Sequence, residues 1–275
     1  IGMLMAPPSL TFISERQMRL IVMEQIACQK GYRMMIGHLL QPEHSENYVN
    51  DFISRGVEGV LCLQHEVMGV EGAITKSLSK IRNVVYLGLP AGVEDPYFVR
   101  MDHGSGVLQA VEHLVSVGRR RIALALAGKQ YTPMCERIEG YKKGLKQAGI
   151  KANEKLMWVG PEKVIPQIQF MQSIYSELIV NQKADAVIAS NDDWAIMLMK
   201  YLQQQGLKIP DDVAVVGYDN LRVSELINPA LTTIDGCEEE VGVSMINMLF
   251  SLVEHGNAPT REVSIKPKLI VRESA

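Results

Sequence analysis

Short apolar runs alternate with longer amphipathic segments along most of the 275-residue chain. The runs include "GVLCL", "NVVYLGL", "IALALAG", "AVIAS" and "VAVVGYD", and helical periodicity fills segments such as 105–117 and 238–254. Strands that are apolar at every position are buried on both faces, which is typical of parallel sheets covered by helices. The alternation of such strands with helices therefore predicts a doubly wound α/β fold.

This pattern has an inflection near Val117–Arg121, with several β-α units before it and several after it. A single sheet of ten or more strands is unusual, and a chain of this length divides readily into two compact parts. We therefore expect two similar α/β lobes.

Polar residues follow several of the apolar runs. Ligands bind beyond the carboxyl ends of the strands in a parallel sheet, so these residues are candidates for a binding site. They are Asp102, Asn191, Asp219 and the pair Gln64 and His65. An Asn or Asp at such a place could instead cap the following helix, and for Asp192 or Asp193 we expect capping rather than binding.

Two aromatic residues are further candidates. Trp194 falls in the first turn of the helix that follows Asn191, where packing in the core and stacking on a ligand both remain open. Phe12 lies in the loop "APPSLTFISERQ" after the first strand.

Composition narrows the class of protein. The net charge of −3 offers no broad basic surface to a polyphosphate, and no apolar stretch reaches the roughly 18 residues of a membrane span. The four cysteines are far apart in the sequence, which argues against a metal site and favours free thiols in a reducing cytoplasm. Because the chain opens inside an apparent strand, "IGMLM", we expect it to be part of a longer protein.

Motifs for catalysis are missing from the sequence. "HGSGVLQ" has two glycines of the dinucleotide fingerprint, but Gln109 stands where the third is needed. There is no phosphate loop of the G-x-x-x-x-G-K-[ST] type, no G-x-S-x-G turn and no pair of histidines at zinc-ligand spacing. We expect no enzymatic activity, no cofactor and no metal.

Three longer segments carry a family resemblance. They are "MDHGSGVLQAVEHLVSVGRRRIALALAG", "RIEGYKKGLKQAGI", and "ADAVIASNDDWAIMLMKYLQQQGLKIPDDVAVVGYDN" with the "NPALTTID" that follows it. Together they resemble the effector-binding domain of the LacI/GalR transcriptional regulators. The resemblance covers essentially the whole chain and is densest over residues 97–235.

The resemblance implies a periplasmic-binding-protein-like fold of two Rossmann-like lobes joined by three crossovers. Matched onto this chain, the crossovers fall near Val117–Gly118, Ile234–Gly236 and Gly256–Arg261. This gives an N-terminal lobe of residues 1–117 and 236–258 and a C-terminal lobe of residues 118–235 and 259–275.

The resemblance also implies an effector held between the lobes and contacted by Arg137, Asn191 and Asp219. Trp194, Phe12, His65 and Asp102 are further ligand contacts that we expect. One cation, one anion and one amide leave no net charge to answer a charged ligand, so we predict a small, largely uncharged polar effector, a sugar or sugar derivative. A nucleobase is the alternative ligand.

Partners follow from the same resemblance. Regulators of this family form homodimers in the cytoplasm and bind operator DNA through an N-terminal helix-turn-helix that this sequence does not contain. The family's N-P-F-F after the first strand is also replaced here, since only Phe12 of that loop is aromatic. The alternative function is a periplasmic solute-binding receptor of a sugar transporter.

Overall fold

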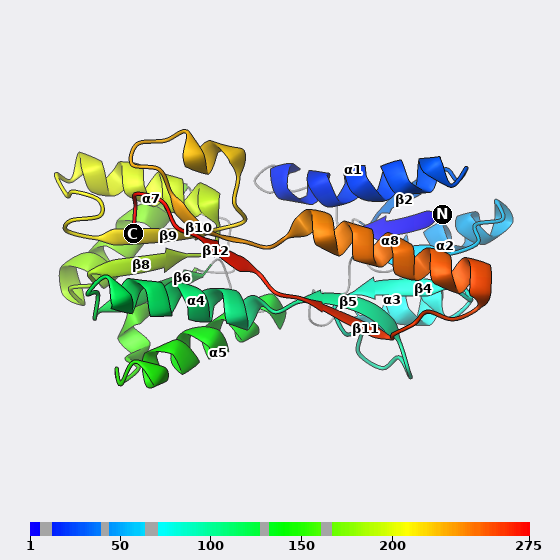
Figure 1. Ribbon diagram of the computed structural model, residues 1–275, viewed down its shortest axis with the longest axis horizontal. Helices are drawn as coiled ribbons and strands as arrows, with labels where there is room; N and C mark the ends of the chain where they lie inside the picture. Colours follow the sequence, from blue (N-terminus) through cyan, green and yellow to red (C-terminus); the bar gives the residue numbers. More distant parts are fainter. Residues whose placement is uncertain (6–12, 40–43, 64–70, 127–131, 161–166) are drawn as a thin grey trace. The chain divides into compact units, whose positions relative to one another are not determined.

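The computed structural model divides the chain into two compact units (Figure 1). It describes residues 1–5, 13–39, 44–63, 71–126, 132–160 and 167–275. The first unit combines Ile1–Met101 with Cys237–Ile265, and the second combines Asp102–Gly236 with Lys266–Ala275. The chain passes from one unit to the other three times, so the predicted two-lobed α/β fold with three crossovers is confirmed.

The first unit is built on a six-stranded sheet in the order β11-β5-β4-β3-β1-β2, in which all paired strands are parallel. Its elements are β1 (Gly2–Met5), α1 (Ile13–Gln29), β2 (Met35–His38), α2 (Ser45–Ser54), β3 (Val60–Cys62), α3 (Glu71–Leu78), β4 (Val84–Leu87), β5 (Tyr97–Met101), α8 (Glu238–His255) and β11 (Glu262–Ile265).

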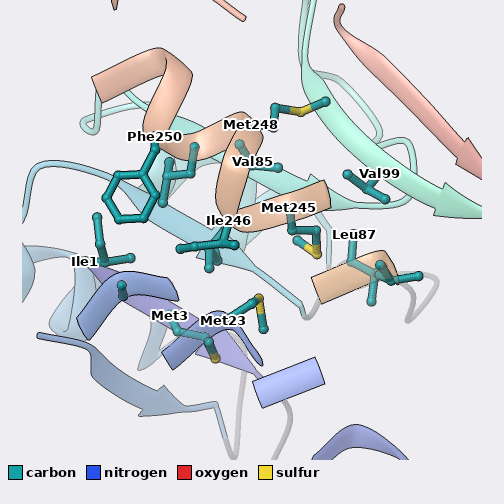
Figure 2. Close-up of a cluster of buried hydrophobic side chains, with 14 of the residues drawn as sticks. Ile1, Met3, Met23, Val85, Leu87, Val99, Met245, Ile246, Met248 and Phe250 are labelled. Atoms are coloured by element: carbon teal, nitrogen blue, oxygen red, sulfur yellow. The ribbon is translucent and has the colours of Figure 1, made fainter. Parts of the chain in front are cut away.

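Both faces of this sheet are covered by helices. On one face Met3, Val85 and other strand residues pack with side chains of α1 and α8, a cluster that Figure 2 shows in close-up. On the other face Leu4 packs with residues of α2 and α3, among them Phe52 and Ile74. Successive strand residues thus point to opposite apolar layers, which explains why β1, β3 and β4 in the middle of the sheet carry no charged residue.

The second unit repeats this plan with a six-stranded sheet in the order β12-β10-β9-β8-β6-β7, in which only β12 is antiparallel to its neighbour. Its elements are α4 (His103–Ser116), β6 (Ile122–Leu126), α5 (Thr132–Gln147), η2 (Glu154–Leu156), β7 (Met157–Val159), α6 (Gln167–Ile174), η3 (Tyr175–Asn181), β8 (Ala186–Ala189), α7 (Asp192–Gln204), β9 (Ala214–Tyr218), η4 (Arg222–Glu225), β10 (Thr232–Asp235) and β12 (Lys268–Ile270). Helices α4 and α5 share one core with the sheet, and α6, η3 and α7 share another.

Two of the three expected boundaries differ from those of the structure. The first crossover follows Met101 rather than Val117, because α4 packs against α5 and meets Ile234 and Pro267 at its Gly106. The third follows Ile265, because β11 pairs with β5 of the first sheet. The second, after Gly236, agrees with the expectation.

Within the described residues, no helix combines the length and hydropathy that a membrane span requires.

Helices α4 and α5 lie side by side in the second unit and approach each other at a pair of glycines (Figure 1). A Cβ atom added to Gly140 of α5 would lie 2.1 Å from the carbonyl oxygen of Gly104 in α4. The neighbouring Tyr141 is buried and donates its hydroxyl hydrogen to the carbonyl of Ile122 in β6, at 2.8 Å. Gly140 and Tyr141 thus fix α5 against both α4 and the sheet.

We predict that Gly140→Ala destabilises the second unit by about 2 kcal/mol, because the added methyl group meets backbone rather than a side chain that can move. Both tryptophans, Trp158 and Trp194, lie in the second unit, so fluorescence during urea unfolding reports on that unit. Gly72→Ala in α3, where a Cβ would meet nothing within 4 Å, is the matched control and should leave this transition unchanged. An unaltered urea midpoint in Gly140→Ala would contradict the close approach of the two helices.

Candidate functional site

The polar residues at the ends of β8 and β9 lie at one edge of the second sheet. The two strands pair in parallel, with Ile188 opposite Val216. Ser190 and Asn191 after β8 are therefore neighbours of Asp219 and Asn220 after β9. This is the edge at which ligands of parallel sheets bind.

The carboxylate of Asp192 is the centre of a hydrogen-bond network at this edge. It is fully buried, and its Oδ2 accepts hydrogen bonds from the backbone N–H of Leu221 at 2.7 Å and the hydroxyl of Ser224 at 2.6 Å. Its Oδ1 accepts from the hydroxyl of Thr233 at 2.5 Å. Our expectation that Asp192 serves as a helix cap is therefore wrong, because its carboxylate joins the start of α7 to the η4 segment and β10.

Space for this carboxylate depends on Gly217 in β9. A Cβ atom at that position would lie 2.1 Å from Oδ1 of Asp192. Burial raises the pKa of Asp192 to about 6, and the hydrogen bonds from Ser224, Thr233 and Leu221, together with the positive charge of Arg272, only partly offset this effect.

Arg137 extends from α5 to the same strand ends. Its Nη1 donates to the carbonyl of Ser190 at 2.6 Å, and its guanidinium carbon lies 3.6 Å from the centre of the Tyr218 ring. Only 6% of the residue is exposed. The structure thus brings Arg137 beside Ser190 and Tyr218, the residues that precede Asn191 and Asp219.

The stack continues from Tyr218 to His103, a residue that the sequence analysis did not select. The Tyr218 hydroxyl lies 2.8 Å from Nδ1 of His103, and both residues are buried. Tyr218 is the last residue of β9 and His103 the first of α4. Of the two, only Tyr218 could have been found from the sequence, as a hydroxyl-bearing residue at the end of an otherwise apolar strand.

Two of the predicted contacts are helix caps in this structure. Oδ1 of Asn191 accepts from the backbone N–H of Trp194 at 2.9 Å, and Oδ1 of Asp102 accepts from that of Ser105 at 3.0 Å. Capping leaves the Nδ2 amide of Asn191 without a hydrogen bond to any described residue. Asn191, which is 3% exposed, can therefore cap α7 through Oδ1 and still donate a hydrogen bond to a ligand from Nδ2.

Trp194 is engaged in packing. Its ring centre lies 5.0 Å from that of Phe170 and 6.0 Å from that of Trp158, and all three belong to the core beneath α7. The ring remains partly exposed, so packing does not use its whole surface. Phe12 and His65 lie outside the described residues.

The backbone turns sharply after β9, where Asp219 has a φ of 110° and Asn220 a φ of 52°. Such angles are uncommon for residues with a side chain. Contacts on both sides hold this turn, since the N–H of Asp219 donates to the carbonyl of Ile234 at 2.7 Å and Oδ1 of Asn220 accepts from Arg272 at 2.8 Å. The turn leaves Asp219 partly exposed at the sheet edge.

The arrangement suits binding rather than catalysis. A guanidinium, a carboxylate and an amide offer both donors and acceptors, which hydroxyl groups require. Among the described residues, no three histidine, cysteine, aspartate or glutamate side chains are grouped so that they could hold a metal ion.

Comparison with known proteins gives consistent results. Residues 111–275 match the family model of the periplasmic binding protein-like domain. The HTH-type transcriptional repressor PurR of Vibrio vulnificus is 27% identical over 278 residues, covering 100% of this chain and 80% of the relative. The HTH-type transcriptional regulator CelR of Thermobifida fusca is 30% identical over 192 residues, covering 69% of this chain and 56% of the relative.

Solved structures show the same fold. A complex of the transcriptional regulator CelR with cellobiose has a TM-score of 0.86 at 24% identity, covering 100% of this chain and 84% of that one. A LacI family regulator from Enterococcus faecium with bound ribose has a TM-score of 0.80 at 26% identity, covering 99% of this chain and 97% of that one.

We predict that Asp192 makes the second unit more stable at acidic pH than at neutral pH. The pKa of Asp192 rises from the ordinary 3.8 to about 6 on folding, so the folded state binds more protons between these values. The stability that protonation of Asp192 contributes is present below pH 4 and is lost as the pH rises through 6. The free energy of unfolding should therefore fall by about 2 kcal/mol between pH 4 and pH 7.

The measurement compares urea unfolding of the wild type and Asp192→Asn by tryptophan fluorescence across this pH range. The difference in unfolding free energy between them should shift by this amount in favour of the wild type as the pH falls. Asp51→Asn, at an exposed residue of α2, is the control and should give a curve parallel to the wild type. If the unfolding free energies of the wild type and Asp192→Asn changed in parallel with pH, the raised pKa of Asp192 would be contradicted.

Proposed function

The chain belongs to the periplasmic binding protein-like domain family, as the effector-binding domain of a LacI-type transcriptional regulator, and we propose that its effector is a small, largely uncharged polar molecule, a sugar or sugar derivative. The effector contacts Arg137, Asn191 and Asp219 at the carboxyl ends of β8 and β9. Its binding changes the affinity of the whole regulator for operator DNA.

The observation that carries this proposal is the buried position of Arg137 beside these strand ends. Among the described residues the guanidinium has no acidic partner within ion-pair distance, and its Nε is buried without a hydrogen bond. Asp219 supplies an acceptor at the same edge, and Asn191 supplies an amide that donates to no described residue. Hydroxyl groups, which both donate and accept, satisfy such a mixed set without introducing an unpaired charge.

The related proteins support a sugar. One is described in complex with cellobiose and another with bound ribose, and both share the fold of this chain over almost its full length. We further propose that Trp194 packs its exposed part against the apolar face of a ring, and that Asp102, Phe12 and His65 contribute secondary contacts.

We also propose that the regulator acts in the cytoplasm as a homodimer and contacts DNA through a segment outside this chain. The relatives named above are transcriptional regulators, which favours this role over that of a transporter's solute receptor.

We predict that a thermal-shift screen of the purified domain identifies a neutral sugar as its stabilising ligand. The screen covers monosaccharides, disaccharides, nucleobases and small acids. A ligand present at about 100 times its dissociation constant adds about 2.7 kcal/mol to the unfolding free energy. Arg137→Ala should abolish the shift, whereas Arg55→Ala, at the exposed residue that follows α2, should leave it intact. Stabilisation by charged acids alone, or a shift that survives Arg137→Ala, would contradict the proposal, and a nucleobase hit would favour the alternative ligand.

We predict that light scattering shows the domain to be a dimer. We also predict that the domain does not bind operator-like duplexes by itself, because its net charge of −3 supplies no basic surface for phosphates. A monomer that persists at high protein concentration would count against the homodimer. Salt-sensitive binding of the domain to duplex DNA would contradict the assignment of DNA contacts to another segment.

A further inference from the structure

Arg137 is held by contacts that include no ion pair with any acidic residue in the described part of the chain. Among the residues that the structure describes, its guanidinium donates one hydrogen bond, to the neutral carbonyl of Ser190, and lies over one aromatic ring, that of Tyr218. Its Nε is buried and unbonded. A long side chain with so few polar contacts needs some other constraint to keep one orientation, because ordering an arginine side chain costs conformational entropy.

That constraint is provided by Tyr218. The guanidinium carbon lies 3.6 Å from the ring centre, which fixes the guanidinium over the ring by cation–π attraction and packing. The ring itself has little freedom, since Tyr218 is 2% exposed and its hydroxyl lies 2.8 Å from Nδ1 of His103. The His103–Tyr218 pair therefore decides which way Arg137 presents its N–H groups.

The same residues close a ring of contacts. Gly140 lies one helical turn after Arg137 in α5 and meets the carbonyl of Gly104 in the first turn of α4. Gly104 follows His103 directly, and His103 returns to Arg137 through Tyr218. A side chain fixed at both its backbone and its tip has a single available position.

We propose that Tyr218 and His103 are positioning residues for effector binding, which hold the Arg137 guanidinium in the orientation that donates hydrogen bonds to the effector. This inference rests on the proposed role of Arg137 as an effector contact. It assigns no direct effector contact to His103 or to the Tyr218 hydroxyl.

Two variants separate the contributions of Tyr218. Tyr218→Phe keeps the ring under Arg137 and removes the hydroxyl that contacts His103, whereas Tyr218→Leu removes the aromatic stack as well. Tyr141→Phe is the matched control. It removes another buried tyrosine hydroxyl with a 2.8 Å hydrogen bond in the same unit, on the helix that carries Arg137.

The first measurement requires no ligand. The side-chain Nε–H of Arg137 is observed by NMR, with its signal assigned by its loss in Arg137→Lys, and its exchange with solvent is timed. Exchange should accelerate about tenfold in Tyr218→Leu and a few-fold in Tyr218→Phe, because each change loosens the buried guanidinium. Tyr141→Phe should have no effect. Unchanged exchange in both Tyr218 variants, or equal acceleration in Tyr141→Phe, would overturn the proposal.

The second measurement is calorimetric binding of cellobiose and D-ribose. Tyr218→Phe should weaken the sugar that binds by roughly 3- to 10-fold, the effect of about one hydrogen bond. In an Arg137→Lys background, which lacks the planar guanidinium, the same change should have no further effect. Equal losses in both backgrounds would show that Tyr218 acts independently of Arg137 and would overturn the proposal.

The exchange measurement and the binding measurement are independent tests. If neither sugar binds the wild type, neither is the effector, while the exchange of the Arg137 Nε–H still decides whether Tyr218 positions that side chain.

Discussion

The second unit depends on one buried charge. Asp192 lies at the start of α7, yet its hydrogen bonds reach the backbone after β9 and a side chain of β10. This single carboxylate thus links the start of α7 to the segment that follows β9 and to β10. Burying this group costs free energy that only a complete set of donors can offset, so the surrounding residues are constrained in type as well as in position.

This constraint gives four short sequence segments of the second unit a physical meaning. Gly217 is needed because a Cβ atom would collide with the Asp192 carboxylate, and Thr233 supplies the hydroxyl that Oδ1 accepts. In α5, Arg137 reaches the strand ends, Gly140 admits α4, and Tyr141 anchors the helix to β6. The segments "NDD", "VVGYD", "LTTID" and "RIEGY" are therefore parts of one packing solution around the sheet edge.

The same geometry separates structural roles from binding roles. Asp192 is buried and accepts three internal hydrogen bonds, whereas Asn191 beside it caps α7 and its amide has no hydrogen bond to a described residue. Arg137 is buried yet has few polar partners, a combination that is costly in a structural residue and useful in a binding one. The Tyr218 ring stabilises this cation by lying 3.6 Å from its guanidinium carbon, and no described acidic residue lies within ion-pair distance of it.

The sequence by itself determined the α/β class, the two lobes and the placement of Asn191 and Asp219 near one sheet edge, whereas the position of Arg137 was implied only by the family resemblance. It could do so because apolar periodicity and strand–helix alternation are local properties, and the ends of parallel strands meet at one edge. The tertiary structure decided that α4 belongs to the second unit, that Asp192 is a buried hub and that His103 reaches Tyr218. These features depend on contacts between distant residues, 115 positions apart for His103 and Tyr218, and no local pattern specifies which distant partner a buried polar group will find.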